Sequence, residues 1–440
     1  LAAPFFDSEQ FVRKANEAAA DRASEQGVAS VPEEEVVRFG AAVRRLGLAG
    51  AVAEQRALFP PPVLSEARVR ARLGGYDDVE GLARLARDGL RVERHDDFQP
   101  NNLQGDQLVR RSATQLSPAV HAHVLALWRD RALLVARRSD FLLSRRDGEE
   151  PFHAAPVGVV PKSALHPLGR FISDFSWSPR PGSSLNCDAA RLAAVLEHGD
   201  IHCPVLREYV AVIDRAREGF PNQRVLACTF DVRAAHRRVR YSDEDCGLLC
   251  LRLPARPGNK RDELDPLVAC CTRGTFGHSL VAFSWARIGR ALEFLHRKRC
   301  ASAGLGNTSL MELYVDDAFL VGSHEFLSCE LSSATEDVRD LTEDPDAVAD
   351  EKPVTPCSRI EVVGYVFDLD LDVVVPSRKT LCKFAHDLFV SLDKDTVSTH
   401  DLLSFAGRLQ RVCSVLPAFA PFRAPVWRAA ARGGRRSFSR

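Results

Sequence analysis

The chain has 440 residues and a formal net charge of zero, with 45% hydrophobic and 27% charged residues. This composition is typical of a globular protein of two or three domains and points to no particular class of partner. No apolar run reaches the ~18–20 residues of a membrane span, and the start of the chain does not resemble a signal peptide. We therefore expect no membrane association and an intracellular location, cytoplasmic or nuclear. The chain begins with Leu1 and not Met, so we expect a piece of a longer protein.

Residues 1–90 carry the apolar periodicity of helices, for example in "FVRKANEAAADRA" and "DVEGLARLARDGL". The stretch "LFPPPVL" interrupts this pattern and contains no residues with evident chemistry. We predict a mainly helical N-terminal region whose role the sequence does not reveal.

From residue 151 the pattern changes to short β-like runs. "PVGVVPK" at 156–162 and "GRFISDFSW" at 169–177 are predicted strands, and "AARLAAVLEH" and "PVLREYVAVIDRARE" are predicted helices. "RVLACTFDV" at 224–232 is a continuous apolar run, which indicates a buried strand with Asp231 at its exposed end. "LPARPGNKRDELDP" is predicted to be a loop.

The remaining elements alternate between helices and strands. The patterns predict a helix at 278–298, a hairpin at 313–322, a helix at 324–342, a linker in "EDPDAVADEKPVTP", a strand pair in "EVVGYVFDLDLDVVVP", and helices at 377–393 and 398–415. From about residue 220 this order predicts an α+β fold with one antiparallel sheet.

Basic residues are unevenly used along the chain. From Asp401 onward there are eight arginines and no further acidic residue. Such an end suits phosphate backbones, and a solvated tail explains it equally well. Lysine is scarce, with eight lysines against 51 arginines, so a lysine inside a functional motif carries weight.

The predicted hairpin "LYVDDAFLVG" places two adjacent carboxylates between two apolar arms. We interpret Asp316-Asp317 as the turn. Two like charges about 4 Å apart at an effective dielectric of ~20 repel by roughly 4 kcal/mol. A turn that only reverses the chain would use Asn-Gly or Asp-Gly. The pair therefore indicates a bound cation, and Mg²⁺ is the natural candidate because hard cations prefer carboxylate oxygens. The alternative is an exposed acidic turn.

Asp231 offers a third carboxylate, at the end of the strand predicted at 224–232. If this strand and the hairpin are neighbours in one sheet, three carboxylates converge and a site for two metal ions becomes feasible. Such a site performs in-line phosphoryl transfer, in which positioning and charge neutralisation supply most of the catalysis.

These residues resemble a known family. "YVDD" between apolar strands, with "FDVRAAHRRV" upstream, resembles the palm of reverse transcriptases. Other motifs resemble the family's in the same order: "PVGVVPK" and "GRFISDFSWSPRPGSSLN" the fingers, "RGTFGHSLVAFSW" the loop and helix that pack on template and nucleotide, "DEKPVTP" a lysine motif, "VVGYVFD" the primer grip, and "LLSFAGRLQRVCSVLP" the thumb. The resemblance covers roughly residues 90–425 and is to long-terminal-repeat and tyrosine-recombinase (DIRS-like) retroelements.

The resemblance implies a right-hand polymerase of the α+β class, with fingers, thumb and an antiparallel palm sheet. It divides the chain into a helical region of unknown role at 1–90, a lead-in and fingers at 91–223, a palm at 224–352, and the primer grip, thumb and start of the connection at 353–440. The implied activity is RNA-directed DNA polymerisation, a nucleotidyl transfer onto a primer 3′-OH within a retrotransposon polyprotein.

Matching the motifs residue by residue assigns the metal site. Asp231, Asp316 and Asp317 would be the catalytic metal ligands, and the backbone carbonyl of Val232 would complete a site. The resemblance implies two Mg²⁺ ions, for which Mn²⁺ is expected to substitute.

The same matching assigns three cationic residues to the triphosphate. Lys162 and Arg170 would clamp it, since arginine suits bidentate phosphate contacts, and Lys352 would lie near the departing pyrophosphate as a candidate general acid. The alternative for each is a solvated surface charge.

The nucleotide pocket would be formed by Ala235, His236, Phe276 and Gly277, and an ordinary turn before a helix is the alternative for the last two. The chain departs from the family at two positions here. His236 stands where the family usually has Phe or Tyr against a ribose 2′-OH, which puts discrimination against ribonucleotides in doubt. Thr275 replaces the usual Pro before Phe-Gly, which we expect to loosen that turn.

Primer contacts are implied at Tyr314, Gly364 and Tyr365, with buried strand positions as the alternative. The expected partners are an RNA or DNA template, a DNA or tRNA-like primer and dNTPs. Further polyprotein domains (RNase H, and an integrase or recombinase) are expected outside this chain.

Two other functions remain open. An RNA-dependent RNA polymerase shares the palm chemistry, but the Tyr-Val before the aspartate pair, where that class has Gly, disfavours it. A decayed retroelement copy that binds nucleic acid without catalysis would be indicated by loss of a catalytic Asp, and none is lost. Incorporation of dNTPs against rNTPs, and binding without extension, would separate these alternatives.

Overall fold

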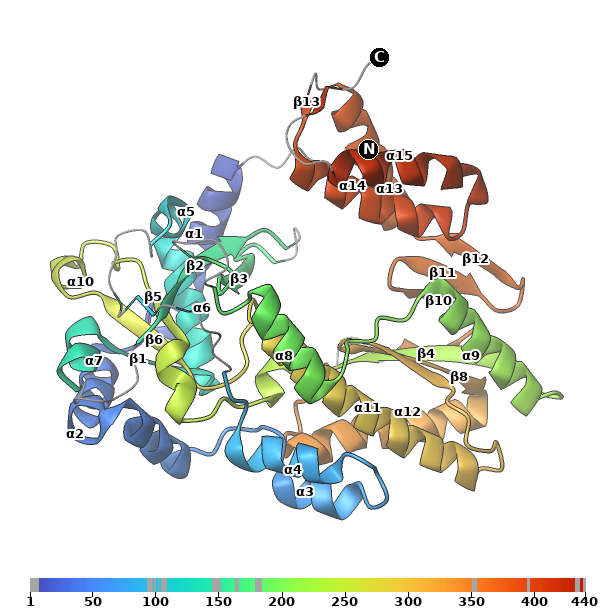
Figure 1. The fold of residues 1–440 in the computed structure, drawn as a ribbon, viewed down its shortest axis with the longest axis horizontal. Helices are drawn as coiled ribbons and strands as arrows, with labels where there is room; N and C mark the ends of the chain where they lie inside the picture. The colour runs from blue at the N-terminus through green and yellow to red at the C-terminus, as the bar shows by residue number, and fades with distance from the viewer. Residues whose placement is uncertain are drawn as a thin grey trace.

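The computed structural model shows a mixed fold of helices and mainly antiparallel sheets (Figure 1), which confirms the predicted α+β class. It describes residues 8–92, 98, 100–101, 103, 109–144, 152–162, 166–178, 184–349, 354–393, 396–431 and 436–437. The prediction of a single antiparallel sheet after residue 220 was wrong. Strands from that part of the chain are divided among sheets of five, four, three and two strands.

Helices form the N-terminal region, as predicted for its described residues. They are α1 (Ser8–Gln26), α2 (Glu33–Leu58), α3 (Glu66–Arg72) and α4 (Val79–Asp88). α2 packs on β1 (Leu133–Arg137) and α7 (Arg138–Ser144), and one continuous hydrophobic core runs from Ala15 to Val348. The N-terminal helices therefore share a core with the elements that follow them.

The five-stranded sheet lies beside these helices. Its strand order is β1, β6 (Leu267–Cys271), β5 (Cys250–Arg252), β2 (Ala154–Val160) and β3 (Arg170–Ser173), with only β2 and β5 parallel. α5 (Arg111–Gln115), α6 (Ser117–Arg129) and the 3₁₀ turn η3 (Glu244–Leu248) pack on this sheet. α8 (Asp188–His198) and the 3₁₀ turn η2 (Ala235–Arg238) contact α11 (Ser279–Ser302). The loop predicted in "LPARPGNKRDELDP" contains a short helix, α10 (Lys260–Leu264). The Asn259 side chain caps it by accepting hydrogen bonds from two backbone N–H groups of its first turn.

The four-stranded sheet is fully antiparallel, with the order β7 (Met311–Tyr314), β8 (Asp317–Ser323), β4 (Val225–Asp231) and β9 (Val354–Cys357). Alternate residues of β8 face opposite layers, as the two-residue strand period requires. Ala318 and Leu320 belong to the core formed with α11 (Ser279–Ser302) and α12 (His324–Thr342), whereas Phe319 and Val321 join the core of α9 (Leu206–Gly219). β9 lies within the predicted linker, where it extends the sheet by pairing with β4.

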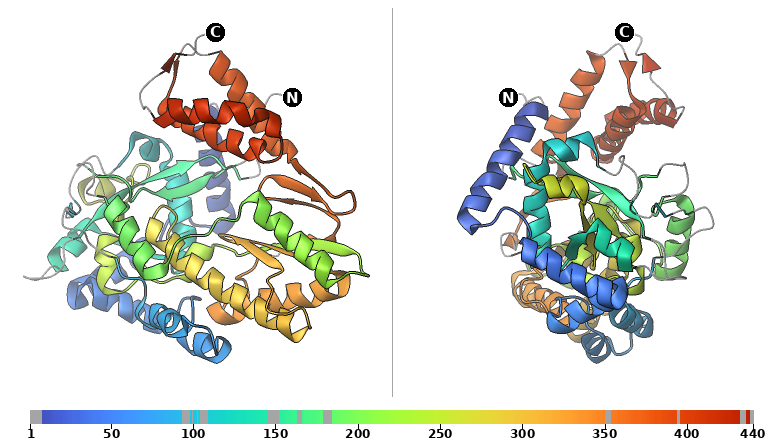
Figure 2. Two further views of the ribbon diagram at one scale, coloured as in Figure 1. Left: turned by 45° about the vertical axis from the view of Figure 1, so that its right-hand side comes forward. Right: turned by 90° about the vertical axis from the view of Figure 1, so that its left-hand side faces the viewer.

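The three-stranded sheet consists of β10 (Arg359–Val362), β11 (Tyr365–Asp368) and β12 (Val373–Pro376), where a strand pair was predicted. The helices α13 (Arg378–Leu392), α14 (Thr399–Cys413) and α15 (Ala420–Ala431) follow it, with the 3₁₀ turn η4 (Pro417–Phe419) and the short strands β13 (Thr396–Val397) and β14 (Arg436–Ser437). Figure 2 shows this helical group, in orange and red, standing apart from the two larger sheets. It has a small core of its own around Phe384, Phe405 and Leu409.

In the described part of the chain, no helix is both long enough and apolar enough to span a bilayer.

Candidate active site

Three carboxylates converge at one end of the four-stranded sheet. Asp231 is the last residue of β4, Asp317 is the first residue of β8, and the two are directly paired across the strands. Asp316 directly precedes Asp317, in the loop between β7 and β8. One carboxylate oxygen from each of the three residues lies within 4.8 Å of the others, and all three side chains are half-buried. Among the described residues, this is the one group of three or more His, Cys, Asp or Glu with such spacing.

The turn that carries Asp316 differs from the predicted one. Tyr314 pairs with Asp317, so the two-residue loop is Val315-Asp316 and Asp317 already belongs to β8. Pairing with Asp231 of β4 draws Asp317 into the strand. Val315 consequently takes a left-handed conformation, with φ of 59°. A β-branched residue in this region costs of the order of 1–3 kcal/mol, and such strain is often found at functional sites.

Hydrogen bonds hold both residues of this loop. The indole Nε1–H of Trp285, in α11, donates to the carbonyl oxygen of Val315 at 2.7 Å. The backbone N–H of Val232 donates to the carbonyl oxygen of Asp316 at 2.9 Å. The structure therefore places Val232 beside the carboxylates, and a ligand role for its own carbonyl stays a prediction.

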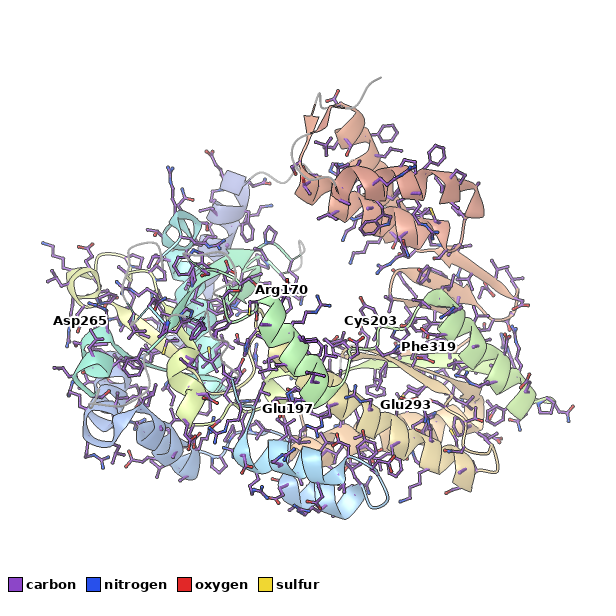
Figure 3. The ribbon with its side chains drawn as sticks, viewed as in Figure 1. Arg170, Glu197, Cys203, Asp265, Glu293 and Phe319 are labelled. Carbon is purple, nitrogen blue, oxygen red and sulfur yellow. The ribbon has the colours of Figure 1, made fainter. Side chains whose placement is uncertain are left out.

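A cavity of about 650 Å³ opens beside the carboxylates. Its lining brings together most of the predicted site residues. They come from the four-stranded sheet with its β7–β8 loop, from η2, from β3 and the residues after β2, and from the turn before α11: Lys162, Arg170, Ala235, His236, Phe276, Tyr314, Asp316 and Asp317. Figure 3 shows Arg170 on the side of the molecule that carries β2 and β3, and Phe319 on the side that carries β4 and β8. The cavity thus has carboxylates from one part of the fold and cationic side chains from another.

Three side chains form a stack in the cavity wall. The ring planes of His236 and Phe276 are inclined by 17°, with centroids 6.0 Å apart, and the Arg170 guanidinium carbon lies 5.0 Å from the Phe276 centroid. Burial lowers the pKa of His236, and the nearby charge of Asp316 offsets this only in part. The imidazole is therefore neutral at pH 7 and offers one donor and one acceptor nitrogen.

The turn before α11 packs directly on β3. Gly277 has φ of 109°, and a Cβ at this position would lie 1.9 Å from the Ser173 carbonyl oxygen, so only glycine fits. The hydroxyls of Thr275 and Ser173 lie 3.1 Å apart, and Asn186 Nδ2 donates to the Gly277 carbonyl oxygen at 2.6 Å. The expectation that Thr275 loosens the turn does not fit this geometry, because its hydroxyl ties the turn to β3.

Five other predicted site residues that the structure describes do not line the cavity: Asp231, Val232, Gly277, Gly364 and Tyr365. Gly364 lies in the β10–β11 turn, in which Val363 and Gly364 both have positive φ. Tyr365 is buried, and its hydroxyl lies 2.9 Å from Ser414 Oγ of the α14 end, so it links the three-stranded sheet to the helical group. Lys352, the predicted general acid, lies outside the described residues.

Sequence reasoning missed several residues of the site. His123, Phe171 and Arg273 also line the cavity, and Trp285 supports the loop behind it. An indole within an amphipathic helix has the pattern of a core residue, so nothing in the sequence distinguished Trp285. Arg273 is the first residue of the "RGTFG" motif, and its guanidinium donates to three backbone carbonyl oxygens. Its burial lowers its pKa to about 9.

Comparisons with known proteins give weak structural similarities. No protein-family profile matches the chain, and no curated protein matches its sequence. A foamy viral protease–reverse transcriptase in complex with an RNA/DNA hybrid is 11% identical, with a TM-score of 0.46 over 85% of this chain and 44% of that one. The same kind of protein in complex with double-stranded DNA is 12% identical, with a TM-score of 0.46 over 87% and 58%. A Candida tropicalis telomerase is 13% identical, with a TM-score of 0.31 over 43% and 44%.

The chain thus spans about half of the length of the first two solved structures. Because the TM-scores lie below 0.5, these similarities carry no conclusion about the activity of this chain.

Proposed function

We propose that the chain is the RNA-directed DNA polymerase of a retroelement and transfers deoxynucleotides to a primer 3′-OH. One observation carries the proposal: Asp231, Asp316 and Asp317 offer oxygen ligands within 4.8 Å of one another at the edge of a cavity of about 650 Å³. Three carboxylates this close repel one another strongly unless cations share their space. Many phosphoryl-transfer enzymes use such carboxylates. The order of the motifs that resemble those of reverse transcriptases supports an RNA-directed DNA polymerase among them.

The carboxylates fit magnesium, because Mg²⁺ selects hard oxygen ligands. Asp231, Asp316 and Asp317 would hold two ions, and Mn²⁺ would substitute. When bound, the ions would lower the pKa of the attacking hydroxyl and neutralise charge on the leaving pyrophosphate.

The other side chains in the cavity would bind the incoming nucleotide. Lys162 and Arg170 would contact its phosphates, and Arg170 is already oriented by the face of Phe276. His236 and Phe276 would pack against the sugar and base. Tyr314, at the end of β7, would lie near the primer terminus.

The arrangement of elements suits a right-hand polymerase. In this proposal the four-stranded sheet with α11 and α12 is the palm, β2 and β3 belong to the fingers, and α13 to α15 form the thumb. Template, primer and dNTPs would enter between these parts. The element's other domains would lie elsewhere in its polyprotein.

Primer extension tests the proposal. Purified protein is incubated with a poly(rA) template, an oligo(dT) primer, dTTP and Mg²⁺, beside Asp316→Asn and a control change of an exposed carboxylate, Asp77→Asn. We expect extension by the wild-type and Asp77→Asn proteins and none by Asp316→Asn. Extension with UTP but not dTTP would favour an RNA polymerase instead. A folded wild-type protein that binds the primer–template and extends nothing would be a decayed copy.

A further inference from the structure

The hairpin loop of the carboxylate site holds a residue in an unfavourable conformation. Val315 has φ of 59°, whereas a two-residue hairpin loop with positive φ at its first position normally has glycine there. The branched Cβ of valine disfavours this region for steric reasons. Local preference alone therefore does not keep Val315 in the observed conformation.

Two elements outside the hairpin bind the loop carbonyls. Trp285 in α11 is 1% exposed, and its Nε1–H donates to the Val315 carbonyl oxygen at 2.7 Å. Val232, just after β4, donates its N–H to the Asp316 carbonyl oxygen at 2.9 Å. Both contacts depend on the direction of the loop peptides, which changes if Val315 moves to negative φ.

We infer that Trp285 is a positioning residue, which holds Val315 left-handed and so presents Asp316 and Asp317 toward the cavity. Trp285 does not line the cavity, so it acts through the loop. The hydrogen bond and the backbone conformation stand on the structure alone, whereas the effect on metal binding rests on the proposed function.

A tryptophan that only fills the core would have different consequences. Trp285→Phe keeps an aromatic ring in the core and removes the N–H donor. Val315→Gly removes the steric penalty of the left-handed conformation, since glycine adopts positive φ freely. If the indole serves to hold Val315, its loss should lower stability and Mn²⁺ affinity much less when position 315 is glycine. If Trp285 only fills space in the core, Trp285→Phe should cause the same loss in the wild type and in Val315→Gly.

A double-mutant cycle decides between these roles. Wild type, Trp285→Phe, Val315→Gly and the double variant are compared by urea unfolding and by Mn²⁺ binding in electron paramagnetic resonance. Trp128→Phe, in α6 and outside the cavity, is the matched control. We expect Trp285→Phe to weaken Mn²⁺ binding and lower kcat about 10- to 100-fold, as misplaced reacting groups do, with the KM for dTTP unchanged. In the Val315→Gly background, Trp285→Phe should lower Mn²⁺ affinity and kcat by no more than about twofold.

The two readouts separate failure of the inference from failure of the proposed function. If the wild type binds Mn²⁺, then equal affinity in Trp285→Phe, or equal losses of affinity in both backgrounds, would overturn the inference. If no protein binds Mn²⁺ but unfolding shows coupling between positions 285 and 315, the proposed function fails and the hold on the loop stands. If the unfolding free energies show no coupling between positions 285 and 315, Trp285 does not hold the loop, whatever the polymerase activity of the variants.

Discussion

Asp231 and Asp317 lie directly opposite each other on β4 and β8, although 86 positions separate them in the chain. Cross-strand neighbours with like charges destabilise a sheet. The sheet nevertheless ends on this pair, with Asp316 close to both. The metal-free protein therefore carries a local repulsion that a divalent cation would relieve.

Asp231→Asn should separate stability from metal binding. Without metal, loss of one of the three charges should raise the free energy of unfolding by about 1 kcal/mol. With millimolar Mg²⁺ the wild type should gain stability through binding, and the variant should gain little. Urea unfolding with and without Mg²⁺ measures both effects, and Asp77→Asn should behave as wild type. A variant that still gains as much from Mg²⁺ as the wild type would contradict the assigned ligand set.

Phe276→Ala should weaken nucleotide binding. The change removes the ring that packs with both the Arg170 guanidinium and the His236 imidazole. Contacts of these kinds contribute about 1–2 kcal/mol together, so we expect the KM for dTTP to rise about 5- to 30-fold. Phe59→Ala is a matched control, because it removes a similar contact with Arg131 outside the cavity. Steady-state kinetics that show equal effects for both variants would argue against a nucleotide contact.

His236→Phe should improve discrimination against ribonucleotides. A neutral imidazole is smaller than a phenyl ring and can form a hydrogen bond with a hydroxyl. We expect wild type to incorporate UTP measurably and the variant to lower UTP use about tenfold or more, with dTTP use unchanged. Relative kcat/KM values for UTP and dTTP measure this. An unchanged ratio would place the 2′-OH elsewhere in the cavity.

Gly277→Ala should damage the turn before α11. The new Cβ would collide with the Ser173 carbonyl at a position with φ of 109°, so we expect a loss of about 1–3 kcal/mol in unfolding free energy and a loss of extension. Gly407→Ala, in the exposed face of α14 with no atom near the new Cβ, should instead stabilise by about 0.5–1 kcal/mol. Thermal unfolding of both variants tests the pair. Similar midpoints for the two would mean that β3 and this turn separate easily.

Stability should fall as the pH drops below about 6.5. Burial lowers the pKa of His278 from 6.5 to about 4, so between these values the unfolded chain holds one more proton than the native protein. The stabilising contribution of His278 is therefore full above pH 6.5. As the pH falls toward 4, the free energy of unfolding decreases by up to about 1.4 kcal/mol per pH unit because of this residue. His278→Asn keeps a hydrogen-bonding partner for the Tyr241 hydroxyl and should flatten the profile. The same change at the exposed His202 should leave it as in wild type.

The sequence predicted the elements whose patterns are local. The helix at 324–342 and the hairpin around "YVDD" follow from apolar periodicity, and Asp231 was placed at a strand end for the same reason. The division of the strands among separate sheets was not predictable, because partners such as β4 and β9 are distant in the chain.

The predicted position of the turn, Asp316-Asp317, was wrong for a related reason. The register of β8 is set by its pairing with β4, which shifts the turn to Val315-Asp316 and creates the strain at Val315. Trp285 was missed because only the folded chain brings its indole to that loop.

The shared core of the N-terminal helices has a practical consequence for shortening the protein. Arg56 of α2 donates to the carbonyl oxygens of Tyr241 and Thr272, and Arg287 of α11 makes a two-pronged ion pair with Asp78 beside α4. Cleavage near residue 90 would leave these partners unsatisfied and expose the apolar surface that α2 covers. We expect residues 33–90 to be needed for a soluble, folded protein, so a stable shorter fragment must include α2.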